Sequence, residues 1–211
     1  MTGFSTLWIG RRLSRLEFAS FRSFVGSGHE LTVYTYRDDV NLPDGVLSAR
    51  ADEIIPASRV FVNHDARTRF AGFSNIFRYR LLQERETTWV DSDVLWLKSE
   101  EPDGRFVFGW ESDDHINGAV LRAPRDSDLL AKLVEQSEKI ASGAFGWGDL
   151  GPKLLTRAIV DEGLDHLALD QPRLYPIPYT DIAKVFMPKW TTAVFQVTED
   201  AFCLHLWAKI S

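Results

Sequence analysis

The chain has 211 residues, of which 45% are hydrophobic and 26% are charged. This length gives one domain room for a core of its own, and the composition excludes disordered, coiled-coil and fibrous proteins. No run approaches the roughly 20 apolar residues of a membrane span, and the first ten residues lack the basic and apolar regions of a secretory signal. We therefore expect one domain over residues 1–211, located in the cytoplasm.

The charge balance limits the binding partners. Lysine and arginine number 24 against 30 acidic residues, which gives a net charge of −6. Such a chain has no overall attraction for nucleic acid or for an anionic membrane. The single cysteine, Cys203, excludes an internal disulfide and a cysteine-rich zinc site. Because Cys203 lies in an apolar run, we expect it to be a small buried side chain.

The first 45 residues alternate between strand and helix patterns. The apolar run at 7–9 predicts a short strand that ends at Gly10. Ser14 and Glu17 have the spacing of a capping box, and apolar residues follow on one face of a helix. Residues 31–36 are β-branched and aromatic, which predicts a second strand. This β–α–β order indicates a parallel sheet covered by helices.

The rest of the chain continues the same alternation without repeats or a linker, so we expect a single α/β domain with a mostly parallel sheet flanked by helices. The patterns predict helices over 71–86, 126–140 and 150–160, and strands over 88–97, 105–110, 119–121 and 202–207.

The tripeptide Asp-Ser-Asp occurs twice, in opposite contexts. At 126–128 it precedes a leucine-containing helix, where aspartate and serine are favoured as caps. At Asp91 and Asp93 it interrupts a β-prone run, and residues two apart project from the same side of an extended chain. Two close carboxylates repel each other unless a cation joins them. The pair Asp91 and Asp93 therefore predicts a site for Mg²⁺ or Mn²⁺.

A polar pair precedes these acids. Asn75 and Arg78 stand three residues apart, on one face of the helix predicted over 71–86. An amide and a guanidinium together can bind sugar hydroxyls and a phosphate.

These residues together resemble a known family. The string Ser74-Asn75-x-x-Arg78-Tyr79, followed by Leu81-Leu82 and by Trp89-Val90-Asp91-Ser92-Asp93-Val94, resembles the core of the DXD sugar-binding glycosyltransferases. That group is similar to glycosyltransferase family 32 and includes fungal initiating mannosyltransferases, α-1,4-galactosyltransferases and the glucosylating clostridial toxins. The resemblance extends over nearly the whole chain through Trp8-Ile9-Gly10, Asn117-Gly118, Gly151-Pro152-x-Leu154-Leu155-Thr156 and His205-x-Trp207.

The resemblance implies a GT-A-like fold and a metal-dependent hexosyltransferase. Such an enzyme transfers a sugar from a nucleotide-sugar donor, here most simply a UDP-sugar, to a glycan, lipid-linked or protein acceptor, with retention of configuration. The metal implied is Mn²⁺ or Mg²⁺. Imidazole suits manganese better, so His205 as a ligand favours Mn²⁺.

The resemblance also implies roles for individual residues. Trp8 would stack on the base, and Trp207 would close over the diphosphate beside His205. Arg78 would bind the donor, and Asn117 would face its sugar. Asp91 and Asp93 would hold the metal, with Asp91 also near the ribose. The catalytic set is therefore Asp91, Asp93 and Arg78, the donor-binding set adds Trp8, Asn75, Asn117 and Trp207, and the metal set is Asp91, Asp93 and His205.

Asn75 departs from the family pattern, which has an acid at that position to hold hydroxyls of the donor sugar. The identity of the sugar therefore stays open. Two other functions are compatible with the sequence. A non-catalytic nucleotide-sugar-binding module would keep the fold without turnover. A haloacid-dehalogenase-type phosphatase would use the first aspartate as a nucleophile beside Mg²⁺, although Val94 and Leu95 follow here where that class has small residues.

Overall fold

The computed structural model describes residues 3–62, 70–146 and 148–208. Strands and helices alternate through most of the chain, and 3₁₀ helices are frequent near its end. The strands are β1 (Phe4–Trp8), β2 (Leu31–Thr35), β3 (Leu47–Arg50), β4 (Thr88–Val90), β5 (Val94–Trp96), β6 (Val107–Trp110), β7 (Ile116–Arg122) and β8 (Cys203–His205). The α-helices are α1 (Arg15–Gly26), α2 (Ala71–Glu84), α3 (Asp128–Ala141), α4 (Pro152–Asp161), α5 (Gln171–Leu174) and α6 (Thr191–Thr198).

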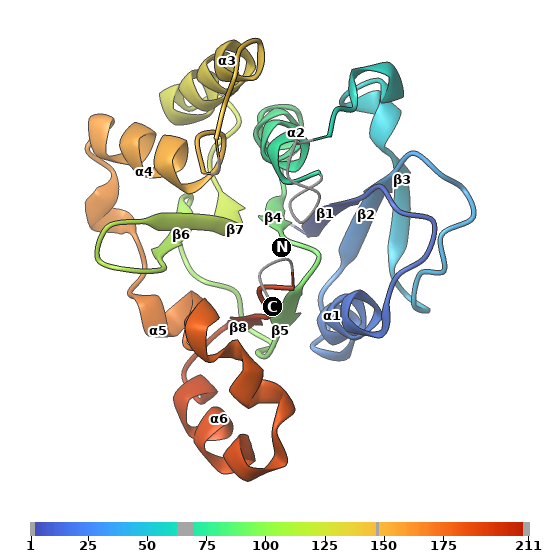
Figure 1. Cartoon of the computed structure of the whole chain (residues 1–211), viewed down its shortest axis with the longest axis vertical. Helices are drawn as coiled ribbons and strands as arrows, with labels where there is room; N and C mark the ends of the chain where they lie inside the picture. The colour runs from blue at the N-terminus through green and yellow to red at the C-terminus, as the bar shows by residue number, and fades with distance from the viewer. Residues whose placement is uncertain (1–2, 63–69, 147, 209–211) are drawn as a thin grey trace.

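The central sheet is mixed and mostly parallel. Its order across the described residues is β3-β2-β1-β4-β7-β6. The first four of these strands run parallel, and β7 runs antiparallel to both β4 and β6. Consequently β6 points in the same direction as β4. Strands β5 and β8 pair antiparallel in a small second sheet beside the first (Figure 1).

Side chains of the strands alternate between two apolar cores, one on each face of the sheet. Leu7 and Trp89 join the core under α2, α3 and α4, whereas Phe4 and Val90 join the core that contains α1, β5 and β8. Figure 1 shows α2 to α4 on one side of the strands and α1 on the other. The sequence prediction of a single α/β domain with a mostly parallel, helix-flanked sheet is confirmed.

Most of the expected elements are present. The three helices predicted over 71–86, 126–140 and 150–160 are α2, α3 and α4, with ends shifted by one or two residues. Ser127 caps α3 by accepting a hydrogen bond from the Leu130 N–H. The Asp-Ser-Asp at 126–128 therefore has the structural role predicted for it. Cys203 is fully buried, as expected.

One expected element is wrong in a way that matters for the site. The predicted strand over 88–97 is two short strands, β4 and β5, which belong to different sheets. Asp91 and Asp93 therefore lie in a turn between them and not on one side of an extended chain. Strand β3 and the helices after residue 170 were not predicted.

The last 3₁₀ helices and α6 form an extension at one end of the molecule. Helices η5 (Tyr179–Phe186) and η6 (Pro188–Trp190) lead into α6, and Figure 1 shows this segment projecting below the sheet. Within the described residues no helix has both the length and the apolar character needed to cross a membrane.

The start of α1 provides a test of the sequence-encoded caps. The Ser14 side chain accepts from the Leu16 N–H at 3.2 Å, and the Glu17 carboxylate accepts from the Ser14 N–H at 2.8 Å. We expect Ser14→Ala to lower the free energy of unfolding by about 1 kcal/mol, measured by urea denaturation. Ser27→Ala is the matched control, because backbone N–H groups close that end of the same helix. An equal loss in both variants would contradict the prediction.

Candidate functional site

The carboxyl edge of the central sheet gathers polar side chains from neighbouring strands. Trp8 ends β1, Asp91 follows β4 and Glu111 follows β6. Because these three strands share one direction, their carboxyl ends lie at the same edge of the sheet. The antiparallel strand β7 begins there, which adds Asn117. Ligands bind at this edge in open α/β sheets.

Arg78 connects helix α2 to this edge. Apolar residues surround α2 on most of its faces, and Arg78 is itself only 5% exposed. A buried guanidinium needs a counter-charge, and the Asp91 Oδ1 accepts from its Nη2 at 2.7 Å. The indole N–H of Trp89 donates to the same oxygen at 2.7 Å. Both bonds use Oδ1, so Oδ2 is the oxygen that Asp91 would offer to a cation.

The Arg78 guanidinium fits closely between two neighbours. Its carbon lies 5.1 Å from the centroid of the Trp89 ring, a cation–π geometry. On β7, a Cβ built on Gly118 would collide with its Nη1. The glycine is therefore required by the close approach of the charged group. The Arg78 Nε is buried and has no hydrogen-bond partner among the described residues.

The turn at residues 91–93 orients the two carboxylates. The Asp91 N–H donates to the Ala119 carbonyl at 2.8 Å, and the Val94 N–H donates back to the Asp91 carbonyl at 3.2 Å. These bonds fix the turn against β7 on one side and close it on itself. The chain then enters β5, where Val94 pairs with His205 of β8.

Asp93 is held by the C-terminal segment. Its main-chain carbonyl accepts from the Leu206 N–H at 2.9 Å, and its Oδ2 accepts from the Ala208 N–H at 2.8 Å. The His205 Nε2 lies 3.3 Å from its Oδ1. Asp93 and His205 are both buried. The pairing of β5 with β8 thus brings His205 to an acid more than one hundred residues earlier.

Asp91, Asp93 and His205 form a cluster that can hold a metal ion. One ligand atom from each lies within 4.8 Å of the others. Ligands on opposite sides of a six-coordinate ion with bonds of about 2.1 Å are about 4.2 Å apart, so the cluster is close to coordination distance. Two carboxylates and one imidazole suit a divalent ion such as Mn²⁺. The Nε2 of the His205 ring faces the Asp93 carboxylate, whereas the buried Nδ1 has no hydrogen-bond partner among the described residues.

The protonation of His205 reflects its acidic surroundings. Burial lowers the pKa of His205, but nearby carboxylates raise it more, and the resulting pKa lies above the ordinary value. The carboxylates are Asp93, Asp91 and Glu111. A divalent ion bound in the cluster would balance the same carboxylates.

Glu111 and Tyr175 belong to this environment and were not predicted. The Glu111 carboxylate accepts a hydrogen bond from the Asn117 amide. The Tyr175 hydroxyl donates to the Asn117 carbonyl at 3.1 Å, and burial raises the pKa of Tyr175, which keeps the hydroxyl protonated. The Tyr175 ring also contacts His205, with centroids 6.0 Å apart. The sequence signal that could have identified Glu111 is its position directly after the strand predicted over 105–110.

The structure brings together four of the predicted residues by direct contacts and places the others around them. Arg78, Asp91, Asp93 and His205 form the centre. The Trp207 ring packs on the His205 ring, with centroids 4.1 Å apart. The indole N–H of Trp207 donates to the Ile177 carbonyl at 3.1 Å. Trp207 has a positive φ of 51°, which is uncommon for a side chain of this size.

Trp8 and Asn75 lie further out. Trp8 is partly exposed, and Gly10 approaches the face of its indole so closely that a Cβ there would lie 3.0 Å from the ring. Asn75 lies one helical turn before Arg78, and its amide nitrogen is 3.0 Å from the Cβ position of Gly151 at the start of α4. Trp8 and Asn75 are both partly exposed.

Comparison with known proteins identifies the architecture. No family model matches the sequence, and no curated protein matches it. A solved structure described as PaToxG Glycosyltransferase is similar with a TM-score of 0.59, over 94% of this chain and 78% of that one. The chain has the fold of a GT-A type glycosyltransferase. The two sequences are 14% identical, so the likeness shows the fold alone.

Gly118 allows a test of how the site is packed. We expect Gly118→Ala to displace the Arg78 guanidinium and to lower the free energy of unfolding by about 1–3 kcal/mol, measured by denaturant titration. Gly26→Ala is the control, since a Cβ there meets nothing within 4 Å. That variant should match or slightly exceed the stability of the parent protein. A Gly118→Ala protein as stable as the control would show that the guanidinium is not confined as described.

Proposed function

We propose that the chain is a metal-dependent glycosyltransferase that uses a nucleotide-sugar donor, a UDP-sugar in the first instance. The observation that supports this most directly is the cluster of Asp91, Asp93 and His205 at the carboxyl edge of a GT-A type sheet. The order of short motifs along the chain supports membership of the DXD sugar-binding family. Residues 1–211 would form the catalytic domain.

The chemistry explains why such a cluster is useful. Glycosyl transfer breaks the bond between the anomeric carbon and the diphosphate, so negative charge grows on the leaving group. A divalent ion bound here would supply Lewis-acid stabilisation of that charge. Asp93 is suited to be a direct ligand because the Ala208 and Leu206 N–H groups fix its position. Arg78 adds a fixed positive charge at the same edge, which needs no reorganisation during reaction.

The remaining predicted residues would bind the donor around this centre. Trp8 is proposed to stack on the base, because a partly exposed indole at the end of β1 offers a flat apolar face. Asn75 and Asn117 are proposed to bind donor hydroxyls. The Asn117 amide is oriented by Glu111, so the position of this side chain is set before a ligand arrives. Trp207 is proposed to close over the diphosphate from beside His205. The acceptor would be a glycan, a lipid-linked sugar or a protein.

A binding panel tests the function. We expect UDP-sugars with Mn²⁺ to raise the melting temperature, because a ligand that binds only the folded state stabilises it by mass action. Asp93→Ala should abolish the Mn²⁺-dependent shift. Asp128→Ala is the matched control, since it changes the same tripeptide where it begins helix α3. GDP- and TDP-sugars in the same panel identify the base.

The outcomes separate the alternatives. Equal effects of the two aspartate variants, or no shift with any nucleotide sugar, would contradict the site. Binding without transfer or donor hydrolysis would favour the non-catalytic module. Release of phosphate from simple sugar phosphates would favour the phosphatase.

His205 tests the identity of the metal. We expect His205→Gln to weaken Mn²⁺ binding about tenfold or more in the presence of UDP, with a smaller effect on Mg²⁺, because imidazole contributes more to manganese. Isothermal titration calorimetry with each metal measures both constants. Equal losses for the two ions would contradict a direct His205 ligand.

A further inference from the structure

The pairing of β6 with β7 shifts register beside the candidate site. Gly109 pairs with Asn117, whereas Val107 pairs with Arg122, so two steps along β6 match five along β7. The extra residues make a bulge in β7, and bulges are frequent next to active sites because they redirect side chains. We call residues 117–120 the bulge. Its backbone lacks the regular partners of a ladder on β6 and needs others.

Tyr175 supplies partners for the bulge. Its hydroxyl donates to the Asn117 carbonyl at 3.1 Å and accepts from the Val120 N–H at 3.3 Å. One hydroxyl thus satisfies an acceptor and a donor of the bulge. The Tyr175 side chain is only 1% exposed, so water does not compete for either bond.

The bulge in turn fixes residues of the candidate site. Gly118 leaves the space in which the Arg78 guanidinium lies. The Ala119 carbonyl accepts from the Asp91 N–H at 2.8 Å and so holds the turn that carries both aspartates. A shift of the bulge backbone would therefore move the guanidinium and this turn together.

The Asn117 side chain depends on the same backbone. Its Oδ1 accepts from the Ala119 N–H at 2.7 Å, and its amide nitrogen donates to Glu111. The bond to Ala119 spans two residues of the bulge, so the direction of the amide follows the local backbone.

Tyr175 also contacts the C-terminal side of the site. It follows the last residue of α5, and α5 packs against both β6 and β8. The Tyr175 ring contacts the rings of His205 and Trp207, with centroids 6.0 and 6.2 Å apart. A single buried side chain therefore lies between the bulge and the segment that carries His205.

We infer that Tyr175 is a positioning residue for the proposed reaction, with its hydroxyl holding the bulge so that Arg78, Asp91 and Asn117 keep the arrangement that binds metal and donor. Packing alone would need only the ring, whereas the hydroxyl is bonded to two backbone groups of the bulge. The inference rests on the proposed function, because the metal and the nucleotide are the ligands whose binding it concerns.

Tyr175→Phe tests the hydroxyl alone, because the ring remains. We expect this variant to bind Mn²⁺ in the presence of UDP about tenfold more weakly, measured by isothermal titration calorimetry, because the turn at Asp91 loses its fixed support. Hydrogen exchange followed by NMR is the second readout. The amides of Asp91 and Ala119 should exchange faster than in the parent, while those of β2 keep their protection.

Tyr79→Phe is the matched control. Tyr79 is also fully buried, and its hydroxyl donates to the Leu150 carbonyl at 3.1 Å, outside the bulge. We expect both variants to lose stability to a similar extent, but only Tyr175→Phe to lose affinity for Mn²⁺ with UDP. If either variant melts near the assay temperature, all proteins are compared in trimethylamine N-oxide, an osmolyte that favours the folded state.

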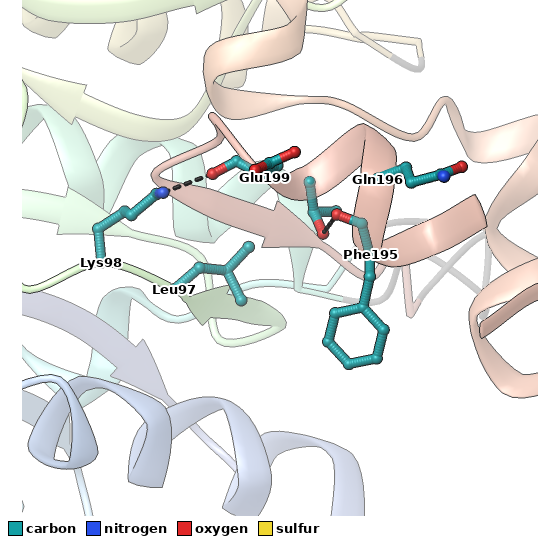
Figure 2. Close-up of a pocket in the computed structure, with 6 residues that line it drawn as sticks. Leu97, Lys98, Phe195, Gln196 and Glu199 are labelled. Atoms are coloured by element: carbon teal, nitrogen blue, oxygen red, sulfur yellow. Dashed lines mark hydrogen bonds between the residues drawn. The ribbon is translucent and has the colours of Figure 1, made fainter. Parts of the chain in front are cut away.

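Phe195→Ser is a control in the extension that follows Tyr175 in the chain. Phe195 and Leu97 line a hollow of about 470 Å³ (Figure 2). Leu97 directly follows β5, at the opposite end of that strand from Asp93. We expect this variant to bind Mn²⁺ with UDP as the parent does, because Tyr175 acts through the bulge and not through the extension.

Three results would overturn the inference. The first is equal affinity of the two tyrosine variants in a parent that binds Mn²⁺ and UDP, which would leave the proposed function standing. The second is faster exchange throughout the sheet, β2 included, which would assign the Tyr175 hydroxyl to general stability. The third is a parent that binds neither Mn²⁺ nor UDP, which would contradict the proposed function as well.

Discussion

The buried charge of Arg78 is the constraint on which the candidate site depends. A guanidinium inside an apolar helix–sheet interface is costly unless an anion meets it, and Asp91 supplies that anion at 2.7 Å. The pair joins helix α2 to the turn after β4. It also explains two neighbours that look incidental in the sequence, because Trp89 supports both charged groups and Gly118 leaves room for the guanidinium.

The second constraint is the return of the chain to this turn at its end. Strand β8 pairs with β5, and the residues after it donate two main-chain hydrogen bonds to Asp93. One acid of the pair is thus fixed by an internal helix and the other by the C-terminal segment. This division gives the two carboxylates different surroundings. Asp91 is the more exposed of the two, and Asp93 is buried against His205.

The sheet explains why these constraints meet where a ligand can reach them. Strands β1, β4 and β6 end at one edge, and β7 starts there, so a tryptophan, an aspartate, a glutamate and an asparagine from distant parts of the chain gather at one edge. The extension formed by η5, η6 and α6 starts beside this edge and projects below the sheet (Figure 1). The molecule therefore separates a polar edge, where the proposed metal ligands lie, from an end that exposes large apolar side chains.

The sequence by itself determined the alternation of strands and helices and the caps at Ser14 and Ser127, whereas most proposed members of the site came from the resemblance to the DXD family. These features depend on neighbours within a few residues, which periodicity and capping rules describe. Only the tertiary structure decided that residues 91–93 form a turn between two sheets, that β8 brings His205 to Asp93, and that Glu111 and Tyr175 complete the surroundings. Those outcomes come from contacts between residues tens to more than one hundred positions apart, and local patterns carry no record of which distant strands will pair.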